Sequence, residues 1–106
     1  MVERFDVYLV SLDEQVTKDP KNTRPCVVVS PDEMNRHISN VIIAPLSAAS
    51  GKFPTRIVTE FLNSKRMIVL DQIRTVDKAR LVKKIGTIDK PQQTEILDCL
   101  AELFAD

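Results

Sequence analysis

Two groups of polar side chains stand at the ends of short apolar runs, and their residue types can bind phosphate and nucleobases. Arg24 comes shortly before the apolar run Cys26–Val29. The other group follows the run Met67–Leu70 and contains an acid, an amide and a base: Asp71, Gln72 and Arg74. A guanidinium can grip two phosphate oxygens and stays charged at any working pH. The acid, the amide and the base can read base edges or bind phosphate.

The two apolar runs predict the elements that hold these side chains. Both runs are short and rich in β-branched residues, which is typical of strands buried on both faces. Polar residues at the ends of such strands are presented to a ligand by a rigid scaffold. Ser47, at the end of a third run, and Phe53, in the segment after it, add a hydroxyl and an aromatic ring that an unpaired base can stack on.

Each of these residues also has a plainer interpretation. Arg24 could form an ordinary surface ion pair with a nearby acid, and Ser47 by itself is a common loop residue. Phe53 could equally be a packing residue. For Arg74 and Asp77, a buried polar network that ties the strand end to the following turn is an equally good explanation.

Length and charge limit the class of protein. A chain of 106 residues predicts one domain, residues 1–106, with one modest core. Its 15 basic and 15 acidic residues leave no net charge, which argues against a strongly electropositive DNA-binding protein but permits a local groove. The apolar stretches are too short to span a bilayer, and the N-terminus lacks the apolar core of a signal peptide. Cytoplasmic residence without membrane association is therefore expected.

Several catalytic schemes do not fit the composition. One histidine, His37, cannot supply a histidine pair within one subunit. The carboxylates form no tight acidic motif of the kind that holds two metal ions. Two glycines cannot build a phosphate-binding or dinucleotide-binding loop. Cys26 and Cys99 are read as buried free thiols. No metal and no organic cofactor is predicted.

The pattern of apolar residues predicts several short strands and one terminal helix. The expected strands are Phe5–Val10, Cys26–Val29, Val41–Leu46, Arg56–Thr59, Arg66–Leu70 and Val82–Ile88. Loops are expected at Ser11–Thr23 and Ser47–Phe53, and helical turns at Asp32–Arg36 and Asp77–Leu81. Pro91 opens a helix whose apolar stripe is expected in the core: Ile96, Leu97, Leu100, Leu103 and Phe104. These elements predict an α+β fold, a small and strongly bent antiparallel sheet close to a barrel with a C-terminal helix.

The segments that carry these residues resemble one known family over nearly the whole chain. They are FDVYLVSLD at Phe5–Asp13, TRPCVVVSPDEMNR at Thr23–Arg36, APLS at Ala44–Ser47, PTR at Pro54–Arg56 and LDQIRTVDKARLVKKIG at Leu70–Gly86. The chain is similar to the MazF/PemK family of toxin endoribonucleases of type II toxin–antitoxin systems. This resemblance implies the partly open, SH3-like barrel that the family shares with CcdB toxins, assembled as a two-fold symmetric homodimer.

The resemblance also implies an activity and a partner. The activity is metal-independent, sequence-specific cleavage of single-stranded messenger RNA, in which attack by the 2′-hydroxyl leaves 2′,3′-cyclic phosphate and 5′-hydroxyl ends. The partner is a cognate antitoxin whose acidic, flexible tail blocks the RNA groove. The alternative is a non-enzymatic toxin of the CcdB kind that inhibits a protein such as DNA gyrase. Arg24 together with a hydroxyl at Ser47 stands against this alternative.

Individual roles follow from the same resemblance. Arg24 falls on the catalytic arginine of the family's RP motif, and Ser47 falls where many members have threonine. One branch has a catalytic aspartate at the position of Asp71, helped by an arginine where this chain has Val69. This departure favours Arg24 and Ser47 as the catalytic pair. The remaining RNA contacts are expected from the following residues: Lys18, Lys21, Phe53, Asp71, Gln72 and Arg74.

The first loop departs from the family pattern. Many relatives have a glycine and a glutamate shortly before the RP motif, whereas this chain has Thr17 and Asp19 followed by Pro20. The loop closes over RNA in the family, so its different composition implies that the cleavage sequence cannot be carried over from a relative.

Overall fold

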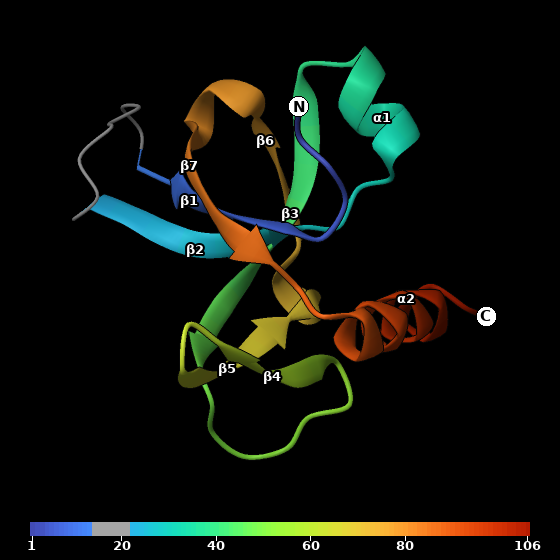
Figure 1. Ribbon diagram of the computed structural model, residues 1–106. Coiled ribbons are helices and arrows are strands. Elements are labelled where there is room, and N and C mark those ends of the chain that lie inside the picture. The colour runs from blue at the N-terminus through green and yellow to red at the C-terminus, as the bar shows by residue number, and fades with distance from the viewer. Residues whose placement is uncertain (14–21) are drawn as a thin grey trace.

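The computed structural model describes residues 1–13 and 22–106 and shows a bent sheet with a long C-terminal helix (Figure 1). Its strands are β1 (Asp6–Ser11), β2 (Thr23–Val28), β3 (Asn40–Ala48), β4 (Arg56–Phe61), β5 (Ser64–Val69), β6 (Arg74–Asp77) and β7 (Leu81–Thr87). Its helices are α1 (Asp32–His37) and α2 (Lys90–Leu103), with single 3₁₀ turns η2 (Leu70–Gln72) and η3 (Lys78–Arg80).

All strand pairs are antiparallel, and the sheet runs in the order β4-β5-β3-β2-β1-β7, with β6 on β3. The strand β3 passes through the middle of the molecule (Figure 1) and changes partner along its length. Its first residues pair with β6, and its last residues pair with β5. The sheet bends at this change and is not closed. The predicted fold, a strongly bent antiparallel sheet with a C-terminal helix, is confirmed.

The two faces of the sheet carry separate apolar clusters. Alternate residues of a strand point to opposite faces. Along β2, Val27 joins a larger cluster that also contains Ile68, Leu70 and Ile96, whereas Cys26 and Val28 join a smaller one. The residues Cys26–Val29 are at most 3% exposed, so the prediction that this strand is buried on both faces is confirmed.

Two predicted elements have different bounds in the structure, and one strand was not predicted. The strand expected at Arg66–Leu70 ends at Val69, and Leu70 begins the turn η2. Ser47 and Ala48 still belong to β3, so the loop expected at Ser47–Phe53 begins later. The strand β6 was not predicted because its four residues, RTVD, show too little apolar alternation. The loop predicted at Ser11–Thr23 lies mainly outside the described residues.

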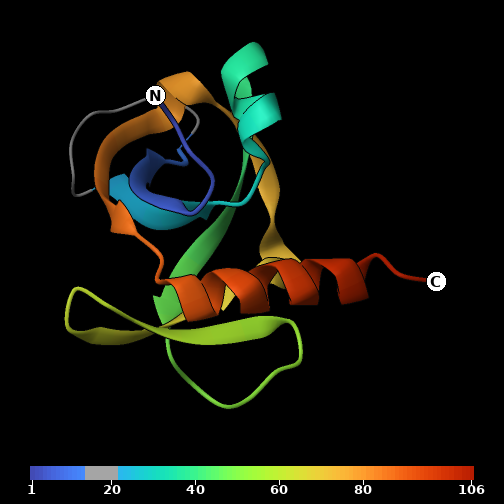
Figure 2. The same cartoon turned by 45° about the vertical axis from the view of Figure 1, so that its right-hand side comes forward.

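The apolar stripe of α2 is mostly not in the core, contrary to the prediction. Ile96 is fully buried and Leu100 is half-buried, but Leu97 is 38%, Leu103 is 36% and Phe104 is 71% exposed. Figure 2 shows that α2 lies above β4 and that its C-terminal end extends past the strands. Within the described residues, no helix is both long and apolar enough to cross a lipid bilayer.

The bend brings the strands at the two ends of the sheet order together. Phe61 at the end of β4 is only 8% exposed and reaches Gly86 of β7. A Cβ atom on Gly86 would lie 2.7 Å from Cζ and 2.8 Å from Cε1 of Phe61, closer than real Cβ contacts allow. The strands β4 and β7 are not hydrogen-bonded to each other. Glycine at position 86 leaves room for the Phe61 ring to pack between them.

We expect the variant Gly86→Ala to lower the free energy of unfolding by about 1–3 kcal/mol, the usual cost of overpacking a core. Urea unfolding monitored by circular dichroism measures the change. The control is the double variant Gly86→Ala/Phe61→Leu, in which the shorter side chain makes room for the methyl group. Its loss should be smaller than the sum of the two single losses. Additive losses would contradict the proposed contact.

Candidate functional site

A pocket of about 300 Å³ opens at the rim of the smaller apolar cluster. Its walls come from the end of β1 and from β2, β3, η2 and β6. The lining residues are Leu12, Arg24, Cys26, Ile43, Pro45, Leu46, Ser47, Gln72 and Arg74. Four of the predicted site residues are therefore brought together: Arg24, Ser47, Gln72 and Arg74.

The register between β2 and β3 explains why Arg24 and Ser47 meet. Residues two apart on a strand share a face, so Arg24 points to the same side as Cys26, and Ser47 to the same side as Pro45. Cys26 and Pro45 are directly opposite each other in the ladder. Arg24 and Ser47 lie two residues beyond this last pair of the ladder, one on each strand. Two residues widely separated in sequence thus face the same pocket.

The other wall of the pocket is formed by η2 and β6. Leu70, the first residue of η2, is fully buried, and Gln72 at the end of the same turn lines the pocket. Arg74 begins β6 and lies opposite Ile43 of β3 in the antiparallel pair. This pairing places the guanidinium of Arg74 at the pocket.

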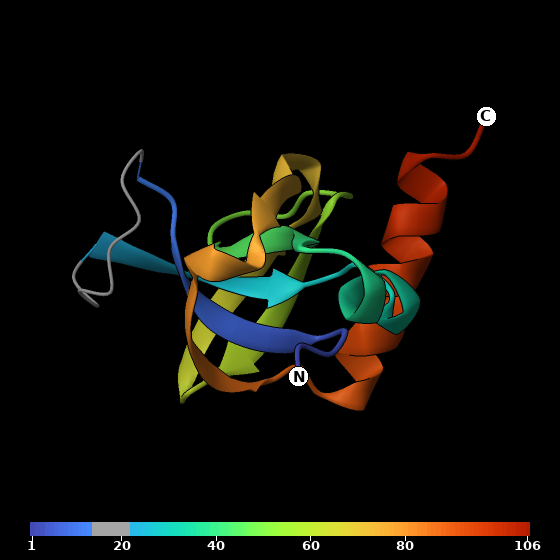
Figure 3. The same cartoon turned by 90° about the horizontal axis from the view of Figure 1, so that it is seen from above.

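The pocket has an apolar floor and a polar, cationic mouth. Cys26 and Ile43 are buried, whereas Arg24, Ser47 and Arg74 are exposed. None of the nine described lining residues is acidic. Seen from above, the end of β1 and the start of β2 lie on the side of the sheet away from α2 (Figure 3), so the helix does not cover this end. The arrangement suits an anion with an attached apolar group, such as a phosphate with its nucleoside.

The thiol of Cys26 at the floor is chemically inert at neutral pH. Burial raises the pKa of Cys26 to about 12, against a smaller opposite effect of the Arg74 charge. A nucleophilic cysteine requires a thiolate, which this environment disfavours. The chemistry of the pocket therefore rests on its arginines, its hydroxyl and its amide.

Asp71 and Phe53, which were predicted to contact RNA, do not line the pocket. The Asp71 carboxylate accepts hydrogen bonds from Thr55 Oγ1 (2.9 Å), Arg56 Nε (3.2 Å) and Arg56 Nη2 (3.3 Å). The hydrogen bonds from Arg56 and then from Thr55 hold the pKa of the Asp71 carboxyl below its usual range. Phe53 is 46% exposed, and the Arg56 guanidinium lies 4.5 Å from its ring centre. Lys18 and Lys21 lie outside the described residues.

Sequence reasoning missed two partners, Thr55 and Arg56, that hold Asp71. The segment PTR at Pro54–Arg56 was noted only for its likeness to the family. Its contact with Asp71 spans 15 to 16 positions along the chain, which no local pattern reports. The pocket floor was missed for a similar reason, because a buried cysteine or isoleucine gives no sign of lying beneath a ligand site.

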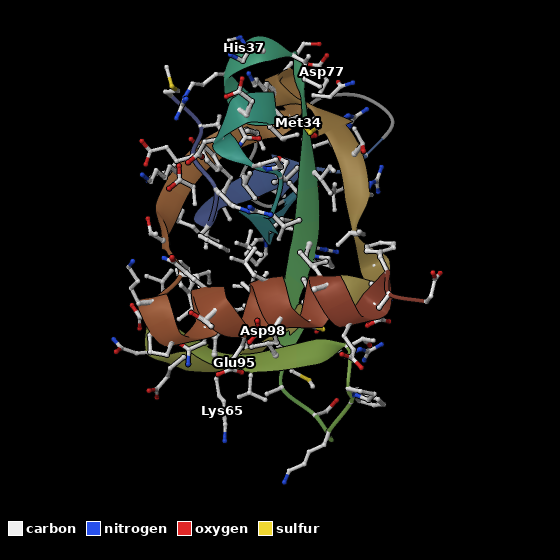
Figure 4. The ribbon with its side chains drawn as sticks, turned by 90° about the vertical axis from the view of Figure 1, so that its right-hand side faces the viewer. Met34, His37, Lys65, Asp77, Glu95 and Asp98 are labelled. Atoms are coloured by element: carbon white, nitrogen blue, oxygen red, sulfur yellow. The ribbon has the colours of Figure 1, made fainter. Side chains whose placement is uncertain are left out.

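Two other polar residues lie away from the pocket, at the end of the molecule that carries α1 (Figure 4). His37 is exposed on α1 beside Glu33, with 3.5 Å between Nε2 and Oε1. The Asp77 carboxylate accepts a hydrogen bond from the backbone N–H of Ala79 and so caps the turn η3. Asp77 therefore ties a strand end to the following turn, but it is exposed and does not belong to the buried network that the plainer interpretation described. Among residues 1–13 and 22–106, no three His, Cys, Asp or Glu side chains gather as potential metal ligands.

Comparisons with known proteins agree with this fold. Residues 3–104 match the family described as PemK-like, MazF-like toxin of type II toxin–antitoxin system. The chain is 31% identical to the endoribonuclease MazF of Staphylococcus epidermidis, covering 94% of this chain and 88% of that protein.

Two solved structures have the same fold. The structure of an endoribonuclease in complex with its cognate antitoxin from Mycobacterial species has a TM-score of 0.81 at 22% identity and covers 96% of this chain and 93% of its own. The structure of MazE–MazF from Deinococcus radiodurans has a TM-score of 0.79 at 15% identity, with 98% and 95% covered.

The buried Cys26 thiol should make stability depend on pH. Above about pH 8.5 the unfolded thiol loses its proton while the folded one keeps it, so the unfolded state binds fewer protons and stability falls as pH rises. The stability of the wild type relative to Cys26→Ala should therefore fall by about 1.4 kcal/mol per pH unit between roughly pH 8.5 and pH 10. Urea unfolding across this range measures the difference. Parallel pH dependences for the two proteins would contradict the assignment.

Proposed function

Because the chain belongs to the PemK-like, MazF-like toxins of type II toxin–antitoxin systems, we propose that it is a sequence-specific endoribonuclease that cleaves single-stranded messenger RNA in the cytoplasm. The observation that carries this proposal is the pocket in which Arg24, Ser47, Gln72 and Arg74 surround an apolar floor, with no acidic residue among its described lining. Such a pocket attracts a phosphodiester and leaves room for its nucleoside.

The proposed reaction is an internal transesterification. The 2′-hydroxyl of one nucleotide attacks the adjacent phosphorus and loses its proton, and the bond from phosphorus to the 5′-oxygen breaks. A proton is delivered to that oxygen, so the products end in a 2′,3′-cyclic phosphate and a 5′-hydroxyl. The reaction passes through a dianionic, pentacoordinate centre, which fixed positive charge and hydrogen-bond donors stabilise.

Each residue of the mouth has a role in this scheme. The fork of Arg24 binds the equatorial phosphate oxygens, and the Ser47 hydroxyl donates a hydrogen bond to the same group. Gln72 and Arg74 hold the neighbouring base or phosphate. In this scheme the positive charge comes from the two guanidiniums, so the reaction requires neither a metal ion nor an organic cofactor.

The size of the pocket supports a homodimer as the active form. At about 300 Å³ it holds one nucleotide, whereas recognition of a cleavage sequence needs several. A two-fold symmetric interface doubles the surface, because each protomer contributes the same patch to one channel. Lys18 and Lys21 of both protomers are proposed to line that channel.

A cognate antitoxin is the proposed regulatory partner. Two of the similar structures are described as an endoribonuclease with its cognate antitoxin and as MazE–MazF. An acidic, flexible antitoxin tail would bind the cationic mouth of the pocket and exclude RNA from it. Inhibition then follows from competition for the same charges.

The catalytic pair is tested by cleavage of a long RNA in EDTA, with mapping of the new ends. Arg24→Ala should reduce the rate by about 10²–10³-fold, the usual effect of losing one such donor, and Arg24→Lys should recover little because a point charge cannot replace the fork. Ser47→Ala should also slow cleavage, while Ser47→Thr keeps the hydroxyl and should be tolerated.

The matched control is Arg36→Ala, which removes an exposed cation from α1. It should leave the rate unchanged. Full activity of a folded Arg24→Ala protein would refute its role. A wild-type protein that binds and inhibits DNA gyrase without cleaving RNA would favour the alternative function.

The dimer and the antitoxin are tested together by sedimentation and RNA binding at assay concentrations. We expect a dimer whose RNA affinity falls as salt rises, because phosphate binding releases counterions even though the chain has no net charge. Added antitoxin should weaken RNA binding. A fully active monomer, or simultaneous binding of RNA and antitoxin at undiminished affinity, would disagree with this assembly.

A further inference from the structure

Both oxygens of the Asp71 carboxylate are occupied by side chains from the start of β4. Thr55 Oγ1 and Arg56 Nε donate to Oδ1 at 2.9 and 3.2 Å, and Arg56 Nη2 donates to Oδ2 at 3.3 Å. The Arg56 guanidinium is also held against the Phe53 ring, 4.5 Å from its centre. We call the set of Thr55, Arg56 and Asp71 the η2 clamp.

The backbone supports the same connection. The N–H of Leu70 donates to the carbonyl oxygen of Thr55 at 3.1 Å, and the N–H of Arg56 donates to the carbonyl oxygen of Phe53 at 3.2 Å. Arg56 pairs with Val69 as the last rung of the β4–β5 ladder. The clamp therefore continues the ladder beyond the strand end and joins the first residues of η2 to β4.

The residue that this connection controls is Gln72. In a 3₁₀ turn successive side chains are rotated by about 120°, so Asp71 and Gln72 point in different directions from one short turn. Asp71 points to β4, and Gln72 lines the pocket with Arg24 and Ser47. Arg74 is less dependent on the clamp, because the pairing of β6 with β3 holds it directly.

We infer that Asp71 is a positioning residue, which fixes η2 through Thr55 and Arg56 so that Gln72 meets the substrate, and that Asp71 itself does not touch RNA. This inference rests on the proposed function. Both oxygens of the carboxylate accept hydrogen bonds from Thr55 or Arg56, and Asp71 does not line the pocket. The guanidinium of Arg56 also neutralises a charge that would otherwise repel phosphates. A general base must lie within hydrogen-bond distance of the proton that it removes. We infer that the Asp71 carboxylate, which is bound to Thr55 and Arg56, does not lie that close to the substrate.

A double-mutant cycle in RNA cleavage separates positioning from direct contact. Asp71→Ala should lower kcat/KM by about 10–100-fold, as expected when a binding group shifts by about 1 Å. In the Gln72→Ala background the same change should have almost no further effect, because the group it positions is gone. If Asp71 contacted RNA itself, its loss would lower kcat/KM by the same factor in both backgrounds and overturn the inference.

Two further variants and a pH profile exclude a merely structural effect. Thr55→Val keeps the size of the side chain but removes its hydroxyl, and it should show a smaller loss that also disappears without Gln72. The matched control Asp98→Ala removes an exposed carboxylate from α2 and should leave kcat/KM unchanged. The shape of the pH–rate profile should be the same in Asp71→Asn and wild type. Loss of its acidic limb would make Asp71 the base.

Amide hydrogen exchange tests the clamp without depending on cleavage. The Leu70 N–H, which donates to Thr55, should exchange at least about tenfold faster in Asp71→Ala, while the amides of β2 keep their protection. Unchanged exchange at Leu70 would overturn the clamp even if RNA is cleaved. A wild type that cleaves no RNA but shows the expected exchange would instead refute the proposed function and, with it, the role of Gln72.

Discussion

The arrangement of this protein depends on the pairing of β3 with three other strands. Its first residues pair with β6, its middle with β2 and its last residues with β5. Pro45 lies in the interval between the β6 and β5 partners and has no N–H to donate, so the interruption leaves no unpaired donor there. The sheet can bend at this point, while the sheet itself separates the two apolar clusters on its faces.

The candidate site is a direct consequence of this bend. The smaller apolar cluster is open at the rim where β2 begins and β3 ends, and the pocket lies there. Two arginines from different strands meet over an apolar floor, so a chain without net charge still presents a cationic mouth. Overall charge therefore says little about anion binding when strand pairing concentrates charges of one sign.

The same framework places Asp71 and its partner Arg56 outside the pocket. Arg24 and Arg74 face the pocket, whereas Arg56 is turned to Asp71 outside it. Asp71, the neighbour of Gln72 in sequence, therefore lies outside the pocket, and in our proposal it anchors η2. This explains how an aspartate and a glutamine that are neighbours in the chain can serve different purposes.

Local sequence patterns were enough to predict the strongly patterned elements and the family. The β-branched run Cys26–Val29 predicted a strand buried on both faces, and Arg24 before it predicted a cation at the strand end. Both predictions were possible because strand propensity and burial depend on the types of neighbouring residues. Which distant residues meet became visible only in the folded chain. The short β6, the pairing of Asp71 with Arg56 and the exposure of Phe104 depend on partners many positions away, and a local pattern carries no information about such partners.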